Sequence, residues 1–255
     1  MKRLFFLLFA MTSFLSCNLN NKRDKYSDYV LSKNPNDTIT SEMMKTKDFT
    51  NSIFLNEISL KDGQKQKAGL SFIMVMDTAK FIVSAKHLLG QDGGFKDSIR
   101  LDKIAETLAN WNFSNLSNTN NFSTNTNNIV ETNGDVLIFN NIKNSSTSNL
   151  KSFKLTKDYP LTTINGTIDI KNSPTTYFVV GYTNSGRETL YELKLAGEYE
   201  KKDFLFKKID KFDFHGLSGA PIINKKGEVL AILSGGLTYN GDELIVGSKI
   251  RPLNL

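Results

Sequence analysis

Three short segments of this chain carry side chains that together could do covalent chemistry. An apolar run over residues 81–83 leads to His87, and Asp135 immediately precedes a second apolar run over residues 136–139. Ser218 lies in a glycine-rich turn further along the chain. A serine hydroxyl is a weak nucleophile at neutral pH, so it needs an imidazole to accept its proton and a carboxylate to orient that imidazole. The chain therefore contains, in the order His, Asp and Ser, the three groups that nucleophilic catalysis by serine requires.

The residues around these three positions resemble the motifs of the trypsin-like (chymotrypsin-fold) serine peptidases. The segment Val83-Ser84-Ala85-Lys86-His87 is similar to the family's Thr-Ala-Ala-His, and Gly216-Leu217-Ser218-Gly219-Ala220-Pro221 is similar to its Gly-Asp-Ser-Gly-Gly-Pro. Asp135-Val136-Leu137-Ile138 resembles the family's Asp-Leu-Ala-Leu-Leu, which is the least specific of the three motifs. The resemblance runs from about Ser52 to the end of the chain and includes the separations between the motifs.

The resemblance implies a role for each of these residues. Ser218 would be the nucleophile, His87 the general base, and Asp135 the group that orients the imidazole. The backbone amides of Gly216 and Ser218 would form the oxyanion hole, because glycines leave the approach to these amides free of side chains. The expected activity is hydrolysis of a protein or peptide substrate through an acyl-enzyme, with no metal and no cofactor.

Alternatives remain for each position. His215 is the only other histidine, and its place beside the serine motif suggests that it lines the cleft or touches substrate. A buried core histidine is the usual role of a lone His, and a glycine-rich segment before a strand is commonly a simple turn. Three other carboxylates compete with Asp135 for its role, and none of them leads directly into an apolar run between the other two motifs: Asp102, Asp158 and Asp213.

The resemblance also implies a substrate pocket. Residues Ser234, Gly235 and Gly236 would form one wall of the pocket for the side chain that precedes the scissile bond, and the two glycines predict that this wall is open. Phe212 occupies the position, six before the nucleophile, where trypsin carries an aspartate. The substrate side chain before the scissile bond is therefore expected to be small or apolar rather than Lys or Arg. Leu217 replaces the aspartate to which a new N-terminus binds in many secreted members, so that activation switch is absent.

The N-terminal segment predicts export and lipidation. Lys2-Arg3 precedes an apolar run from Leu4 to Leu15, which is too short to span a bilayer comfortably and is placed like the core of a secretion signal. Leu15-Ser16-Cys17 resembles the lipobox of bacterial lipoproteins, in which the cysteine is acylated after cleavage. Cys17 is the only cysteine and forms no internal disulfide. We expect a signal peptide over residues 1–16 and a protein anchored by lipid in the bacterial cell envelope, on the extracytoplasmic side.

The remaining composition divides the chain. Residues 17–49 are polar and rich in Asn, Lys and Asp, which favours a tether with at most a short helix over residues 40–47. Residues 50–255 form the expected peptidase domain, because short runs of β-branched and aromatic residues alternate there with turn formers. The pattern predicts an all-β fold, and spacing alone leaves a sandwich open. The family implies two six-stranded antiparallel β-barrels, chymotrypsin-like, over about 50–145 and 146–255, with the active site in the cleft between them.

Charge excludes one class of partner. The net charge is +6, but lysines and acidic residues are interspersed and no basic stripe is interleaved with aromatic residues, so nucleic-acid binding is not expected.

The asparagine-dense stretch between the His and Asp motifs predicts a surface loop, and Trp111 at its start is expected in the core. The competing function is a lipid-anchored binding protein of the same fold that has lost activity.

Overall fold

The structure of the protein is a computed structural model. It describes residues 26–27, 29–31, 41–45, 47–115, 121–124, 129–130, 134–140, 150–157, 159, 162–164, 176–183, 185–199, 202–239 and 241–252. The predicted signal peptide and Cys17 lie outside these residues, as does most of the predicted tether. Within the tether, a short helix is present at the position that the sequence predicts, over Ser41–Lys45.

Strands form almost all of the described structure. The first half of the chain contains β1 (Tyr26–Ser27), β2 (Tyr29–Leu31), β3 (Ile53–Leu60), β4 (Lys65–Met76), β5 (Ala79–Ala85), β6 (Leu108–Ser114), β7 (Asn121–Thr124), β8 (Ile129–Val130) and β9 (Val136–Phe139). The second half contains β10 (Phe153–Lys154), β11 (Thr162–Ile164), β12 (Thr176–Tyr182), β13 (Glu188–Tyr199), β14 (Asp203–Lys208), β15 (Pro221–Ile223), β16 (Val229–Tyr239) and β17 (Asp242–Lys249). The helices are α1 (Ser41–Lys45), α2 (Ile104–Thr107) and the 3-10 turns Lys86–Leu89, Gln91–Gly93 and Leu101–Lys103.

The second half of the chain folds into a closed barrel of six strands. Their order is β13-β12-β15-β16-β17-β14, and β14 pairs with β13 to close the ring, with every pairing antiparallel. β1 extends this sheet beyond β13. The interior is tightly filled, since a Cβ at Gly247 would lie 2.7 Å from the Phe206 ring and 2.9 Å from the Ile222 side chain. Glycine at this position thus allows the larger neighbours to fill the barrel.

The first half of the chain forms a curved sheet that stays open. Its order is β7-β6-β3-β4-β5-β9-β8, and among the described strands β7 and β8 remain as unpaired edges. The all-β, chymotrypsin-like fold is confirmed, but this sheet is a half-barrel and not the closed six-stranded barrel that the resemblance implies.

Aromatic side chains form the core of the half-barrel. Trp111 is fully buried, as the sequence predicts. Its ring meets that of Phe139 edge-on at 5.0 Å, and the Phe113 ring meets Phe139 edge-on at 5.6 Å. Edge-to-face contacts of this kind stabilise beyond the area that they bury. They join β6 to β9, the strand that follows Asp135.

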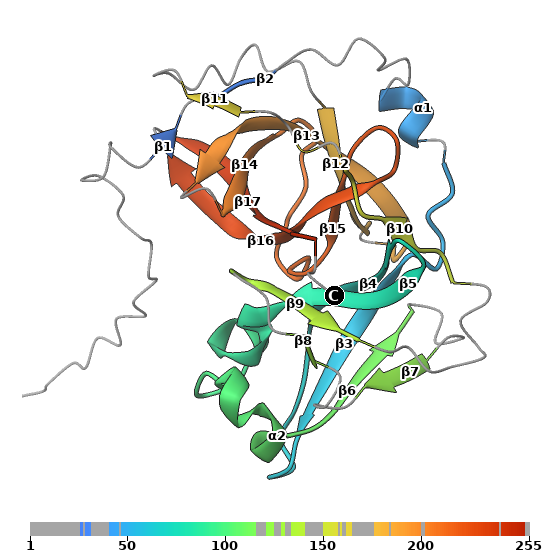
Figure 1. Ribbon diagram of the computed structural model, residues 1–255, viewed down its shortest axis with the longest axis vertical. Helices are drawn as coiled ribbons and strands as arrows, with labels where there is room; N and C mark the ends of the chain where they lie inside the picture. Colours follow the sequence, from blue (N-terminus) through green and yellow to red (C-terminus); the bar gives the residue numbers. More distant parts are fainter. Residues whose placement is uncertain are drawn as a thin grey trace, which may run out of the picture.

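One continuous core links the two sheets. Figure 1 shows the barrel of β12 to β17 lying against the half-barrel, with β4, β5 and β9 on the side that faces it. Residues 153–156 connect the two sheets. β10 pairs in parallel with β4 of the half-barrel, and the Thr156 amide donates to the carbonyl of Val229 in the barrel at 2.9 Å. Buried hydrophobic residues of both sheets belong to a single cluster. The two halves therefore form a rigid frame for residues at their junction.

A carboxylate of the barrel holds the chain where it enters the half-barrel. Glu188 of β13 accepts hydrogen bonds from the Asn51 amide at 3.2 Å and from the Ser52 amide at 3.3 Å. Burial raises the pKa of Glu188 to about 7, although these hydrogen bonds oppose the shift. The folded protein therefore keeps a proton on Glu188 at pH values where an unfolded chain has lost it.

This shift predicts how stability depends on pH. Since the folded-state pKa of Glu188 lies above the ordinary value of 4.5, its contribution to stability is present below that ordinary value and is lost as pH rises to about 7. We expect Glu188→Gln to raise the melting temperature at pH 8, relative to wild type, by about 2–4 °C, which corresponds to about 1 kcal/mol after discounting for partial exposure. The two proteins should converge at pH 4.5 when melting is followed by circular dichroism. Glu106→Gln, at an exposed carboxylate of α2, is the control, and an equal effect there would contradict the prediction.

Candidate active site

His87 and Asp135 are brought together where β5 and β9 pair. Ala85 of β5 lies opposite Val136 of β9, so the residues that follow one strand and precede the other are neighbours. Asp135 Oδ1 accepts a hydrogen bond from the His87 amide at 2.8 Å, and Oδ2 lies 2.6 Å from His87 Nδ1. The two side chains are only 18% and 21% exposed. The carboxylate therefore fixes both the position and the ring orientation of His87, and among the described residues Nε2 has no carboxylate partner.

Two opposing effects set the charge of this imidazole. Burial lowers the pKa of His87, but the hydrogen bond and charge of Asp135, together with the charge of Asp92, outweigh burial and raise it above 6.5. A raised pKa makes the imidazole a stronger base. Asp135 thus raises the pKa of the imidazole that it also orients, as the carboxylate of a triad does.

Ser218 lies in two successive tight turns. The Leu217 amide donates to the Phe214 carbonyl at 3.0 Å, and the Ala220 amide donates to the Leu217 carbonyl at 2.8 Å. Gly216 and Gly219 are the third residues of these turns, with φ of 80° and 88°. Such angles are typical of type II turns and favour glycine. The glycines that flank Ser218 in the motif therefore serve the shape of the loop.

The Ser218 loop lies against the strands that lead to His87. The Leu70 amide of β4 donates to the Ser218 carbonyl at 2.7 Å. A Cβ at Gly219 would lie 2.1 Å from the Leu70 carbonyl and 3.2 Å from the Ala85 amide. No other residue fits at that position without moving the loop. The barrel thus presents Ser218 beside the end of β5, two residues before His87.

The predicted nucleophile and the predicted oxyanion donors are not engaged in hydrogen bonds with described residues. Within the part of the chain that the structure describes, neither the Ser218 hydroxyl nor the amides of Gly216 and Ser218 have a hydrogen-bond partner. In free enzymes the hydrogen bond between nucleophile and base is often long and tightens when substrate binds. Both predicted oxyanion donors remain available to a ligand.

A buried polar network beneath the loop was not predicted from the sequence. Asn56 Nδ2 donates to Ser84 Oγ at 3.1 Å, Ser71 Oγ donates to Asn56 Oδ1 at 2.5 Å, and Ser84 Oγ donates to the Leu70 carbonyl at 2.9 Å. All three side chains are at most 1% exposed. Because Leu70 also binds the Ser218 carbonyl, this network joins the backbone of β5 to the loop. Its signals in the sequence are polar residues within largely apolar strands: Asn56, Ser71 and Ser84.

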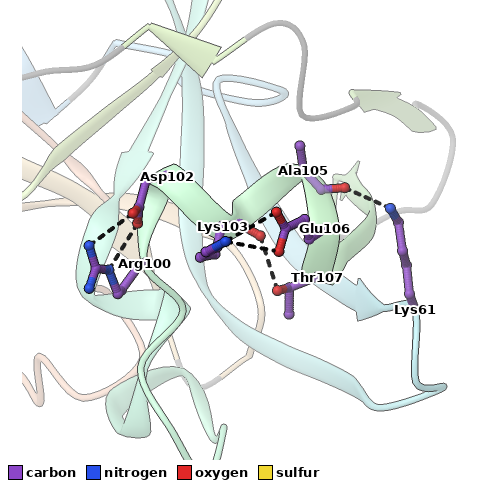
Figure 2. Close-up of polar contacts among 7 residues, drawn as sticks. All are labelled: Lys61, Arg100, Asp102, Lys103, Ala105, Glu106 and Thr107. Carbon is purple, nitrogen blue, oxygen red and sulfur yellow. Dashed lines mark hydrogen bonds and ion pairs between the residues drawn. The ribbon is translucent and has the colours of Figure 1, made fainter.

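The rival candidates have other partners. Asp102 holds Arg100 through both oxygens, at 2.9 Å and 2.8 Å, and Figure 2 shows this pair with the neighbouring contacts of α2. Asp213 is within 2.5 Å of His215 Nδ1, and both side chains are exposed. Asp158 lies outside the described residues. The structure therefore brings Asp135, and neither Asp102 nor Asp213, to His87.

The predicted wall of the substrate pocket runs beside the Ser218 loop. The Gly219 amide donates to the Leu233 carbonyl at 2.7 Å and the Leu233 amide donates to the Ala220 carbonyl at 2.8 Å, so β16 is paired with the loop just before Ser234. The Ser234 hydroxyl is buried without a hydrogen-bond partner among the described residues.

Phe212 and Phe214, two aromatic residues of the Ser218 loop, pack against different partners. The Phe212 ring stacks on Tyr191 at 4.3 Å. A Cβ at Gly236 would lie 2.4 Å from Phe214 Cζ, so the Phe214 ring rests on this glycine. The expected open wall is therefore present at Gly235, where nothing lies within 4 Å of an added Cβ, and is wrong at Gly236, where a ring contributed by the loop takes up the space.

Leu217 explains how the loop is held without a charged residue before Ser218. Its side chain is 6% exposed. A Cβ at Gly181 of β12 would lie 3.0 Å from Leu217 Cδ1. Apolar packing against the barrel thus anchors the loop at the position where many family members place an aspartate.

Comparison with solved structures finds proteases at low sequence identity. The Rv3671c protease from M. tuberculosis in its active form is 12% identical, with a TM-score of 0.49 over 81% of this chain and 85% of that one. The HtrA-type protease AlgW with tripeptide is 10% identical, with a TM-score of 0.46 over 78% of this chain and 56% of that one. No family model and no curated protein sequence matches the chain. At such identities a likeness concerns the fold alone, and at such TM-scores nothing about activity follows from it.

Proposed function

We propose that the protein is a serine endopeptidase that uses Ser218, His87 and Asp135. The observation that carries the proposal is the pair of contacts from Asp135 to the amide and Nδ1 of His87, at 2.8 Å and 2.6 Å, beside a turn that presents a serine hydroxyl. A structural histidine would need only one such contact. A carboxylate that fixes the tautomer and orientation of a ring whose other nitrogen meets no acid in the described part of the chain is typical of a triad.

The reaction follows from these positions. Ser218 Oγ attacks the carbonyl carbon of the peptide while its proton moves to His87 Nε2, and the carbonyl oxygen becomes an oxyanion that the Gly216 and Ser218 amides stabilise. The C–N bond then breaks as the imidazolium gives its proton to the leaving amine, which forms the acyl-enzyme. Water repeats the sequence, and the serine is released. Asp135 stabilises the imidazolium in both halves.

The competing function is a binding protein of the same fold without activity. A fluorophosphonate, which reacts with activated serines, separates the two. We expect the purified protein to be labelled, Ser218→Ala to be unlabelled, and Ser185→Ala, at an exposed serine of the β12–β13 turn, to be labelled like wild type. A folded wild-type protein that takes up no label would support the binding protein.

We also propose that the protein acts in the bacterial cell envelope, anchored by acyl chains on Cys17. The support is the sequence alone: Lys2-Arg3, the apolar run of residues 4–15, and Leu15-Ser16-Cys17. Two or more acyl chains hold a protein on a membrane stably. Among the described residues, no helix is long and apolar enough to cross a membrane.

Cys17→Ser tests this anchor. We expect the wild-type protein to sediment with membranes and to take up a palmitate label, and the variant to lose the label and stay unprocessed or move to the soluble fraction. Ser16→Ala keeps the cysteine and serves as the control. A Cys17→Ser protein that fractionates and labels like wild type would contradict the anchor.

A further inference from the structure

The space between the Ser218 loop and β16 is where a substrate side chain has to lie. The Gly219–Leu233 hydrogen bond at 2.7 Å joins the two segments at one end, and the contact of the Phe214 ring with Gly236 joins them at the other. The resemblance to the trypsin-like peptidases implies that a peptide whose carbonyl is held by the Gly216 and Ser218 amides directs the side chain before the scissile bond into this space. The residue at its far end therefore limits how large that side chain can be.

Phe214 occupies that end. The three atoms closest to a Cβ built at Gly236 all belong to its ring, at 2.4, 3.0 and 3.1 Å. The His215 ring stacks on Phe214 with centroids 5.0 Å apart and an angle of 14°. The Phe214 ring thus lies against the strand at Gly236, which has no side chain to keep it away. On another side it stacks on the His215 imidazole.

Lys208 fixes the ring in this position. Its Nζ lies 5.3 Å from the Phe214 centroid and 5.6 Å from the Phe212 centroid, and it donates to the Phe212 carbonyl at 3.3 Å. The side chain is 19% exposed and forms an ion pair with Glu243 of β17. A partly desolvated cation over two rings attracts both. The lysine therefore holds residues 212–214 of the loop from the barrel side.

We propose that Phe214 closes the side-chain pocket beside Ser218, so that the protein cleaves peptide bonds that follow small residues: glycine, alanine or serine. This inference rests on the proposed peptidase function. It adds a residue that determines specificity, and it names Lys208 as the residue that positions it. A side chain of the size of Leu or Phe would have to displace a ring that is held by a cation and stacked on an imidazole.

The test measures cleavage of a random peptide library by the full-length protein, with the products sequenced by mass spectrometry. We expect cleavage after Gly, Ala and Ser to exceed cleavage after Leu and Phe by about tenfold or more, since each methylene too many costs about tenfold in a fixed pocket. Phe214→Ala should raise the ratio of large to small residues by about tenfold. Lys208→Met, which keeps the apolar stem but removes the charge, should raise it by about threefold.

Ile209→Ala is the matched control, because Ile209 follows Lys208 directly, is 43% exposed and lies outside the predicted pocket. Its ratio should stay within about twofold of wild type, whatever happens to total activity. A wild-type preference for large residues, or an unchanged ratio in Phe214→Ala, would overturn the inference. Should Phe214→Ala not melt cooperatively, Phe214→Leu replaces it, with an expected increase of about threefold. Fluorophosphonate labelling of Ser218 keeps the two proposals apart, since labelling with the wrong preference refutes only the specificity.

Discussion

Ser218→Ala and His87→Ala are each expected to lower kcat by about 10⁴- to 10⁶-fold, and the double variant is expected to lose little more than either alone. The reason lies in the division of work between the two side chains. The hydroxyl supplies the electrons that attack the substrate, and the imidazole accepts the proton that makes the attack possible, so once either is absent the other has nothing to act on. The residual rate comes from the oxyanion donors, which neither change removes.

The measurement is single-turnover hydrolysis of a peptide that the wild-type protein cleaves, with kcat and KM determined separately. KM should change by less than about threefold, because neither side chain contributes much to ground-state binding. Ser185→Ala, outside the site, controls for handling and should keep the wild-type rate. Losses that multiply in the double variant would mean that the two residues act independently, and the triad would then be the wrong description.

The candidate site was predictable because its chemistry is local in the sequence. His87 follows β5 directly and Asp135 directly precedes β9, and residues at the ends of paired strands are placed by the backbone ladder rather than by side-chain packing. Ser218 is flanked by glycines that its turns require. Short-range patterns of this kind survive in a sequence, whereas the pairing of β5 with β9 was not predicted and is seen only in the structure.

Long-range packing was not predictable. Gly236 indicates an empty space, and no local pattern says that a ring of another segment, Phe214, fills it. Glu188 looks like an ordinary strand carboxylate, and its raised pKa arises from contacts with the chain at Asn51 and Ser52, far away in the sequence. The open first sheet has the same origin, because closure depends on which edges meet and not on the apolar pattern of any one strand. The features missed are therefore those that two distant segments make together.

Asp135→Asn is expected to lower kcat by about 10⁴-fold and to move the acidic limb of the kcat/KM profile to lower pH. The amide can donate a hydrogen bond to Nδ1 where the carboxylate only accepts, so the imidazole is left in the tautomer that carries its proton on Nε2 and cannot take one from Ser218. The shift of the limb has a separate cause. Asp135 raises the pKa of His87 above 6.5 in spite of burial, so the neutral, active imidazole is lost as pH falls through that raised value, and removing the carboxylate lowers it.

Asp92→Asn separates these two effects. Asp92 also raises the pKa of His87, but through charge alone and more weakly than Asp135. We therefore expect its limb to move in the same direction by a smaller amount, with kcat at pH 8 within about threefold of wild type, because the tautomer is still set by Asp135. If Asp135→Asn kept most of its kcat while its limb moved, the carboxylate would act only through its charge. If neither limb moved, His87 would not be the base, and the short contact from Asp135 to Nδ1 would be structural.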